Sequence, residues 1–425
     1  MSQLVIDNVR VLDGTGAPPI ADARVIVTDD RIVAVGAAAQ TPAPEGAERI
    51  DGSGRTVLPG FIDVHVHDPS PANMALYVRN GVTAIRFLGG RQRDLLALRD
   101  RIERGEIPGP RVFSVGPGVD ATPHAWPGSA AADSPIEARR LVRRLVREEK
   151  VDAILATHRV TRPILAAIVE TAHEEGVPVT GQIWSADARD AAAVGMDGLD
   201  NTSRIPESTK HPEHTLFEHR SVSERIALLA RLWNDADASA LEEIAQQLAE
   251  RAVFLAPELV SFEAWAGLSW DAVKSDVDFP RDPSEPARQA YERHNAYISK
   301  DWSRQDVADQ ERAIARYAEF CVRYTKLGGP LVTGTDLAFG GILLHRELEL
   351  FAKAGLSNAQ VLRAATRQAA SALGRSDLGF ISTGALADLV IIDGDPTTDL
   401  GALRRVERTI IGGRTVYERA AAGVR

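Results

Sequence analysis

The sequence contains very little cysteine and no long hydrophobic run. Its 425 residues include one cysteine, Cys321, so no intramolecular disulfide can form. No stretch of about 18 apolar residues occurs, and we therefore expect no transmembrane helix. The opening residues MSQLVIDNVRVLDG lack the basic segment followed by an apolar run that is typical of a signal peptide. These absences predict a cytoplasmic protein with no membrane partner.

Basic residues are also in deficit. Lysine and arginine together number 49 against 59 aspartate and glutamate residues, which gives a formal net charge of -10. Proteins that bind nucleic acid usually present a basic face, so the balance argues against a nucleic-acid partner. A hydrophobic fraction of 44% and a charged fraction of 25% are typical of a soluble globular chain. We expect a small-molecule substrate, and the sequence leaves a homo-oligomer open.

Both ends of the chain are rich in short strands separated by turns. Residues 1–57 contain LVIDNVRVLDG and ARVIVTDDRIVAVG, and residues 378–425 contain ADLVIIDGD and VERTIIGGRTVYE. Alternating valine and isoleucine with Asp-Gly turns are typical of antiparallel strands. Neither end has enough strands for a stable sheet of its own. The pattern therefore predicts one small composite β-sandwich built from both ends.

Between these ends, strands alternate with helices, which is the pattern of a parallel α/β barrel. We predict an α/β protein whose residues 58–377 form a TIM-like (β/α)8 barrel. The last two strands are separated by far more residues than a simple connection needs, so we predict a helical lid insertion at about residues 261–327. The eight strand candidates are residues 61–67, 83–90, 111–119, 152–158, 177–184, 197–203, 252–259 and 331–338.

The strongest chemical signal is VLPGFIDVHVH at residues 57–67. Side chains two apart on a strand face the same way, so His65 and His67 are expected to point together into the barrel mouth. Barrel enzymes place their active sites at this end of the strands, and two neutral imidazoles suit a metal ion. The alternative is two ordinary histidines at a polar strand end, but the preceding PGFID favours a site.

The segment PGFIDVHVH resembles the first barrel strand of the amidohydrolase superfamily, in particular its prolidase-like and imidazolonepropionase-like branch. The resemblance continues through GVTAIRFLGG, VGMDGLDN, LVTGTD and GALADLVIIDGDP and covers nearly the whole chain outside the lid. It implies the barrel, the composite sandwich and hydrolytic chemistry at a metal centre. It also implies that His65 and His67 are metal ligands, and that Asp336 binds metal and takes a proton from the attacking water.

Three other ligand positions of that family are occupied by different residues here. Leu155 stands where the family usually has a carboxylated lysine, and Gln182 and Asn201 stand where it has histidines. Neutral amides are weak donors compared with imidazole. We therefore expect at most one divalent metal ion, held by His65, His67 and Asp336, with zinc favoured and iron or no metal as alternatives.

Two further histidines follow barrel strands. His124 lies in DATPHAWPG and His158 ends DAILATH, and both are candidates for acid–base catalysis or substrate contact. A surface position at the start of a helix is the alternative for His158. Trp126 and Trp184 are expected to line a hydrophobic pocket, or else to pack between loops.

Four polar residues are expected to contact the substrate. Gln182 and Asn201 replace family ligands, and Glu258 and Arg86 lie on other strand candidates. Glu258 would bind a cation or act as a base, or remain a solvated charge at the rim. Arg86 would bind an anion or pair with an acidic neighbour. A further cluster in HPEHTLFEH, with three histidines, is interpreted as a solvated loop.

Three functions agree with these features. The favoured one is a hydrolase that uses one metal ion to cleave a C–N bond, in an amide, lactam or related group, of a small, partly hydrophobic substrate. The alternative is a lyase, decarboxylase, cyclase or isomerase with little or no metal, in which the histidines and Asp336 exchange protons. The third is a non-catalytic binding protein. The retained histidine pair and Asp336 favour catalysis.

Overall fold

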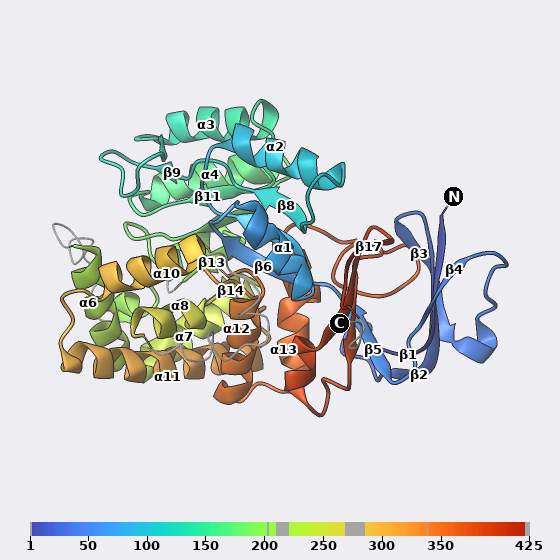
Figure 1. Ribbon diagram of the computed structural model, residues 1–425. Coiled ribbons are helices and arrows are strands. Elements are labelled where there is room, and N and C mark those ends of the chain that lie inside the picture. Colours follow the sequence, from blue (N-terminus) through green and yellow to red (C-terminus); the bar gives the residue numbers. More distant parts are fainter. Residues whose placement is uncertain (1, 202–203, 210–220, 268–284, 338, 421–425) are drawn as a thin grey trace.

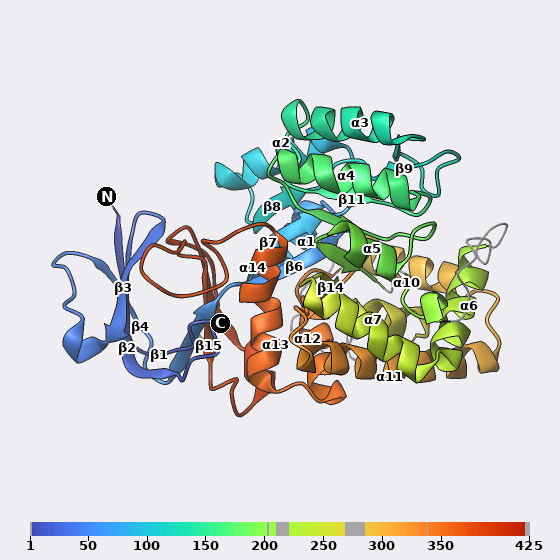
Figure 2. The ribbon, with the colours of Figure 1, turned by 180° about the vertical axis from the view of Figure 1, so that it is seen from behind.

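The computed structural model describes residues 2–201, 204–209, 221–267, 285–337 and 339–420. The protein belongs to the α/β class. Strands from the two ends of the chain gather on one side, and alternating strands and helices form the larger remainder (Figure 1). Figure 2 shows α13 (Asn358–Ala365) and α14 (Arg367–Ala372) between these two parts.

The two ends of the chain pair in one eight-stranded sheet. The strand order is β17-β16-β15-β5-β1-β2-β3, and β4 also pairs with β1. The junction is the antiparallel pairing of β5 with β15, in which Pro59 faces Leu389. These strand pairings form one sheet and do not show two separate layers, so the β-sandwich stays a prediction. The strands are β1 (Gln3–Val11), β2 (Ile20–Thr28), β3 (Arg31–Ala37), β4 (Glu48–Asp51), β5 (Arg55–Pro59), β15 (Leu389–Asp393), β16 (Val406–Ile411) and β17 (Arg414–Glu418).

Aliphatic side chains from both ends share one core in this sheet. Ile6 and Val57 from the first strands pack in the same cluster as Leu389, Ile391 and Ile410 from the last. Burial of each such side chain contributes about 1.5–3 kcal/mol, so each set of strands supplies apolar surface that the other must cover.

The central strands are parallel and distributed over three sheets, β6-β7-β8, β10-β9-β11-β12 and β13-β14. Seven of the eight strand candidates contain a strand; residues 331–338 instead pair with β14 through a single bridge, Leu255 with Leu331. The strands are β6 (Phe61–Val66), β7 (Val82–Phe87), β8 (Arg111–Ser114), β9 (Val119–Asp120), β10 (Ala130–Ala131), β11 (Ile154–Ala156), β12 (Val179–Gly181), β13 (Gly198–Asp200) and β14 (Phe254–Ala256).

Backbone hydrogen bonds connect these sheets in chain order. Asp152 N donates to Ser114 O at 2.8 Å, between β8 and β11. Asp197 N donates to Val179 O at 3.2 Å, between β12 and β13. Val64 N donates to Thr333 O at 2.9 Å, which joins β6 to the eighth candidate strand. A closed eight-stranded barrel is thus not present as one sheet, although each expected neighbour is hydrogen-bonded to the next.

Helix α3 shows how the sequence begins one of the helices between the strands. In α3, Ser134 accepts a hydrogen bond from Glu137 N, Pro135 occupies the first turn, and the buried face holds Leu141 and Leu145. Hydroxyl caps and an early proline are typical helix starts. The helices that alternate with the strands are α1 (Pro71–Arg79), α2 (Gln92–Glu103), α3 (Pro135–Arg147), α4 (Arg162–Glu174), α5 (Ala188–Val194), α6 (Val222–Asp235), α7 (Ala238–Glu250) and α12 (Ile342–Ala354).

The predicted lid region contains α8 (Leu259–Trp265), α10 (Glu285–Ile298) and α11 (Arg304–Lys326), while residues 268–284 lie outside the described residues. Helix α11 packs against α6, α7, α8 and α12 and carries the buried Tyr317, Cys321 and Tyr324. It therefore belongs to the outer layer of helices (Figure 1), and a lid role stays a prediction. None of the helices in the described ranges is both long and apolar enough to cross a membrane.

A buried ion pair joins the composite sheet to the central strands. Asp388, only 4% exposed, accepts hydrogen bonds from Arg111 Nε at 2.6 Å, Arg111 Nη2 at 3.0 Å and Gly412 N at 2.8 Å. Arg111 begins β8, whereas Asp388 precedes β15. The pair thus connects two parts of the chain that are far apart in sequence.

We predict that Asp388→Asn lowers the free energy of unfolding by about 2 kcal/mol, because it leaves the Arg111 guanidinium partly buried without its counter-charge. Urea unfolding followed by circular dichroism measures the change. The control is Asp399→Asn, whose exposed side chain pairs with Arg405 at 2.9 Å, and it should change stability far less. Equal effects of the two variants would contradict the prediction.

Candidate functional site

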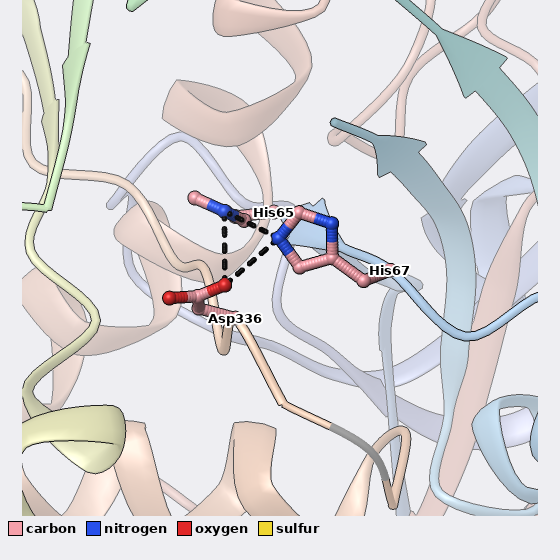
Figure 3. A group of neighbouring side chains, drawn as sticks. All are labelled: His65, His67 and Asp336. Atoms are coloured by element: carbon pink, nitrogen blue, oxygen red, sulfur yellow. Dashed lines mark hydrogen bonds and ion pairs between the residues drawn. The ribbon is translucent and has the colours of Figure 1, made fainter. Parts of the chain in front are cut away.

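His65, His67 and Asp336 lie together where β6 ends (Figure 3). His65 Nε2 is 3.1 Å from His67 Nε2, and Asp336 Oδ1 is 3.2 Å from His65 Nε2 and 2.8 Å from His67 Nε2. The His65 side chain is fully buried, whereas that of His67 is 49% exposed. The three donor atoms therefore converge on one point that is open to solvent on the His67 side.

Backbone hydrogen bonds between β6 and the segment after Leu331 produce this convergence. Asp336 N donates to His65 O at 2.9 Å. Asp63, which is fully buried, accepts from Thr335 Oγ1 at 2.8 Å and from Thr335 N at 3.2 Å. Asp63 was not identified from the sequence, although it lies two residues before His65 and therefore on the same side of the strand.

The second ring nitrogen of His65 is held by Glu258. His65 Nδ1 lies 2.8 Å from Glu258 Oε1, and Asn201 N donates to Glu258 Oε2 at 2.8 Å. Glu258 is fully buried, so it positions a site residue and cannot be a solvated rim charge. Burial opposes a charged His65, but the carboxylates of Glu258 and Asp336 more than offset this and raise its pKa well above 6.5. The surroundings of His65 therefore favour a positive charge, either as a proton on its ring or as a divalent cation bound to it.

These residues suit one divalent metal ion. Two imidazole nitrogens and one carboxylate oxygen are the usual protein ligands of a catalytic zinc. Histidine ligands typically donate their other N–H to a carboxylate, as His65 is placed to do toward Glu258. His65, Asp200 and Glu258 form a second cluster of potential ligands. There, Arg86 Nη2 lies 3.0 Å from Asp200 Oδ1 and already supplies a positive charge.

The two amides at family ligand positions form a hydrogen-bonded chain to Asp336. Gln182 Nε2 donates to Asn201 Oδ1, and Asn201 Nδ2 donates to Asp336 Oδ2 at 3.3 Å. Tyr317 Oη, from α11, donates to Asn201 O. No sequence pattern announces Tyr317, because it approaches from a helix 116 residues further along the chain. The amides thus orient the carboxylate, which is a role that the sequence prediction of substrate contact did not include.

Three site residues at the ends of strands have left-handed backbones. Asn201, Glu258 and Asp336 have φ values of 54°, 50° and 56°. Such a conformation costs a non-glycine residue roughly 1–2 kcal/mol, least for asparagine and aspartate. The surrounding hydrogen bonds hold these side chains in place despite that cost.

Arg86 does not face solvent. It is 1% exposed, its Nε donates to Val64 O at 2.8 Å, and its Nη2 contacts Asp200. The structure supports the interpretation that Arg86 pairs with an acidic neighbour, and it gives no support to an anion-binding role. His124 is exposed between β9 and β10, and no hydrogen bond among the described residues joins it to the three converging residues.

His158, Trp126 and Trp184 form a second group of predicted residues. His158 is 2% exposed, accepts from Trp126 Nε1 at 3.4 Å, and has its ring centroid 3.8 Å from that of Trp184. Burial, together with the charges of Arg225 and Arg159, lowers the pKa of His158 to about 3. A histidine with so low a pKa is neutral at physiological pH, so it cannot serve there as a cationic acid.

A cavity of about 390 Å³ opens beside His67. Its walls include Phe87, Leu88, Leu95 and Leu98, with Arg91 among the polar residues. The cavity thus has both apolar and charged walls, and neither Trp126 nor Trp184 lines it, so the hydrophobic pocket expected at these two residues stays a prediction. The three histidines of HPEHTLFEH lie outside the described residues.

Parts of the sequence, and the fold as a whole, are similar to those of known proteins. Residues 283–416 match the model of the amidohydrolase family. Over 74 residues the chain is 39% identical to an imidazolonepropionase of Mycolicibacterium smegmatis, a stretch that is 16% of this chain and 18% of that protein. The match therefore spans less than a fifth of that curated relative.

Two solved structures align over most of the chain. A bottromycin amidohydrolase is 23% identical, with a TM-score of 0.75 over 97% of this chain and 86% of the other. A prolidase in complex with N-methylphosphonate-L-proline is 21% identical, with a TM-score of 0.71 over 98% of this chain and all of the other. At these identities the two structures show a shared fold.

We predict that His158→Phe makes the protein less sensitive to acid. The folded-state pKa is about 3 and the ordinary value is 6.5, so only the unfolded state takes up a proton between these values. His158 therefore stabilises the fold fully above 6.5, and this stability is lost as the pH falls toward 3.

The measurement is the free energy of unfolding of both proteins at about pH 8 and about pH 5. Lowering the pH from about 8 to about 5 should reduce the free energy of unfolding of the wild type by about 2 kcal/mol more than that of the phenylalanine variant. The same pair of proteins at the higher pH serves as the control. A difference that does not change with pH would show that folding does not lower the pKa of His158.

Proposed function

Because the chain belongs to the amidohydrolase superfamily, we propose that it is a hydrolase with one divalent metal ion. It cleaves a C–N bond, in an amide, lactam or related group, of a small and partly hydrophobic substrate. The observation that carries the proposal is the convergence of His65, His67 and Asp336 within 3.2 Å of one another, with His65 held from behind by Glu258.

His65, His67 and Asp336 would hold the ion, with zinc favoured. A metal in such a site lowers the pKa of a bound water and polarises the substrate carbonyl. Asp336 is ionised, because His65 and His67 lower its pKa although burial opposes this. Its Oδ2, which Asn201 Nδ2 orients, would accept a proton from the attacking water and pass it to the leaving nitrogen. Glu258, Gln182 and Asn201 are positioning residues in this scheme.

The proposal includes the finer architecture. We infer that the hydrogen bonds between the three central sheets close an eight-stranded barrel over residues 58–377, whose mouth holds the site. The helices of residues 261–327 would cover that mouth in part, and the composite sheet would fold into a sandwich. The approach of Tyr317 to Asn201 supports a connection between α11 and the site.

A second function is favoured by one specific observation. Leu155, Gln182 and Asn201 stand at three positions where the family has metal ligands. Within the group of His65, His67 and Asp336, the imidazole of His67 and the carboxylate of Asp336 also form an ion pair, with Nε2 2.8 Å from Oδ1. Such a pair can exchange protons without a metal. The alternative is therefore a lyase, decarboxylase, cyclase or isomerase on the same scaffold.

Metal content and turnover together test the proposal. Protein purified without added metal should contain one equivalent of divalent metal per chain, and a strong chelator should abolish hydrolysis of a panel of N-acyl amino acids, dipeptides and lactams. We predict that His65→Ala removes the metal, because it deletes one of three ligands. Asp336→Asn should lower turnover by a factor of at least about 100, because it removes the proton acceptor.

Two tightly bound equivalents would contradict the single site. Turnover that survives the chelator would eliminate the metal hydrolase and leave the proton-exchange alternative, in which Asp336→Asn is still inactive.

Glu258→Gln tests the positioning of His65. We predict that the metal dissociation constant rises about 10–100-fold, because the carboxylate that orients the ligand is lost. Competition with a chromophoric chelator measures it. The matched control is Glu347→Gln, another buried glutamate, which accepts from the backbone N–H groups of Leu259 and Val260 instead. A similar loss of affinity in both variants would show that Glu258 acts only through the stability of the fold.

A further inference from the structure

We propose that His158, Arg159 and Trp184 form a subsite for a carboxylate attached to a planar apolar group, so that the substrate is an anionic, partly aromatic amide or related compound. This inference rests on the proposed function and adds the chemical class of the substrate. It is carried by an unpartnered buried hydrogen-bond donor, by two neighbouring guanidinium groups and by two indole rings.

The unpartnered donor is His158 Nδ1. Since Trp126 Nε1 can only donate, His158 Nε2 accepts this hydrogen bond at 3.4 Å, and a neutral imidazole then carries its proton on Nδ1. That atom is buried and has no hydrogen-bond partner within the described part of the chain. An unsatisfied buried donor costs about 1–3 kcal/mol, and buried polar groups are rarely left in this state. A ligand oxygen would satisfy it.

Two guanidinium groups lie close enough to His158 for their charges to act on it. Arg159 follows His158 directly, and its Nε is buried without a hydrogen-bond partner among the residues that the structure describes. The guanidinium of Arg225, from α6, lies 5.0 Å from the centroid of the Trp184 ring. The oxygens of the neighbouring Asp120 accept from the backbone N–H groups of Arg159, Ala121 and Ala125. Asp120 thus joins the segment that contains Arg159 to the segment that contains Ala121 and Ala125. The positive charges of the Arg159 and Arg225 side chains favour an anion.

The indole rings define the rest of the ligand. Trp184 packs against His158 with a centroid distance of 3.8 Å, and Trp126 is a large apolar residue that is 47% exposed. An exposed indole beside a buried imidazole offers a flat apolar wall. A carboxylate bound by Arg159 and His158 would therefore be joined to an apolar, preferably planar, group.

The subsite is connected to the three converging residues. Trp184 is two residues after Gln182 on the same segment, and Gln182 is linked through Asn201 to Asp336. Strands β11 and β12 are parallel and hydrogen-bonded to each other, and His158 and Gln182 both follow the carboxyl ends of these strands. One small molecule with a carboxylate near its scissile bond would engage both places.

Benzoate and its neutral analogue benzamide test the proposal directly. Isothermal titration of the protein as purified should show benzoate binding at least about tenfold more tightly than benzamide. Arg159→Gln should weaken benzoate binding about tenfold and leave benzamide unchanged. The control is Arg143→Gln, an arginine of α3 that pairs with Glu174 at 3.0 Å, and it should bind both compounds as the wild type does. If Arg159→Gln does not fold, His158→Phe replaces it with the same expectations.

Equal affinities for the two compounds would overturn the subsite. Benzoate binding that Arg159→Gln does not weaken would also overturn it, because the anion would then be held elsewhere, for example by a metal ion. These outcomes are separate from those of the proposed function. A protein that holds one metal and hydrolyses amides but ignores benzoate loses only the substrate class. A metal-free protein that still prefers benzoate through Arg159 keeps the subsite and loses the hydrolase.

Discussion

The contact between β6 and the segment around Thr333 is the constraint on which the site depends. Residues of β6 and Asp336 are about 270 positions apart, yet Val64 N binds Thr333 O and Asp336 N binds His65 O. These two hydrogen bonds fix the register between the segments. Because neighbouring side chains on a strand point to opposite sides, a shift of one residue would turn His65 away from Asp336.

Four buried ionisable residues next to this contact stabilise one another. His65, Glu258, Asp200 and Arg86 are all buried and are joined through distances of 2.8, 3.9 and 3.0 Å. A lone buried charge costs several kcal/mol, so each group depends on its neighbours. The guanidinium of Arg86 thereby balances part of the negative charge of Asp200 and Glu258.

Much of the site follows from local sequence rules, and the remainder does not. The spacing of His65 and His67 on one strand predicts that they share a side, and the structure brings them to Asp336. The roles of Asp63, Glu258 and Tyr317 escaped prediction because each depends on a contact between distant segments, which no periodicity reveals. The same holds for the eighth strand candidate: its described residues are hydrogen-bonded to β6, but they form only one bridge, to β14.

The composite sheet also has a consequence for synthesis on the ribosome. Strand β5 ends at Pro59 and its partner β15 begins at Leu389, so the two ends lie 330 positions apart in the chain. At roughly 5–20 residues per second, translation takes about a quarter of a minute to a minute to cross that interval. During this time the edge of β5 exposes unpaired N–H and C=O groups, which invite pairing with other chains. The nascent protein is therefore most prone to aggregate through its first strands, long before its site exists.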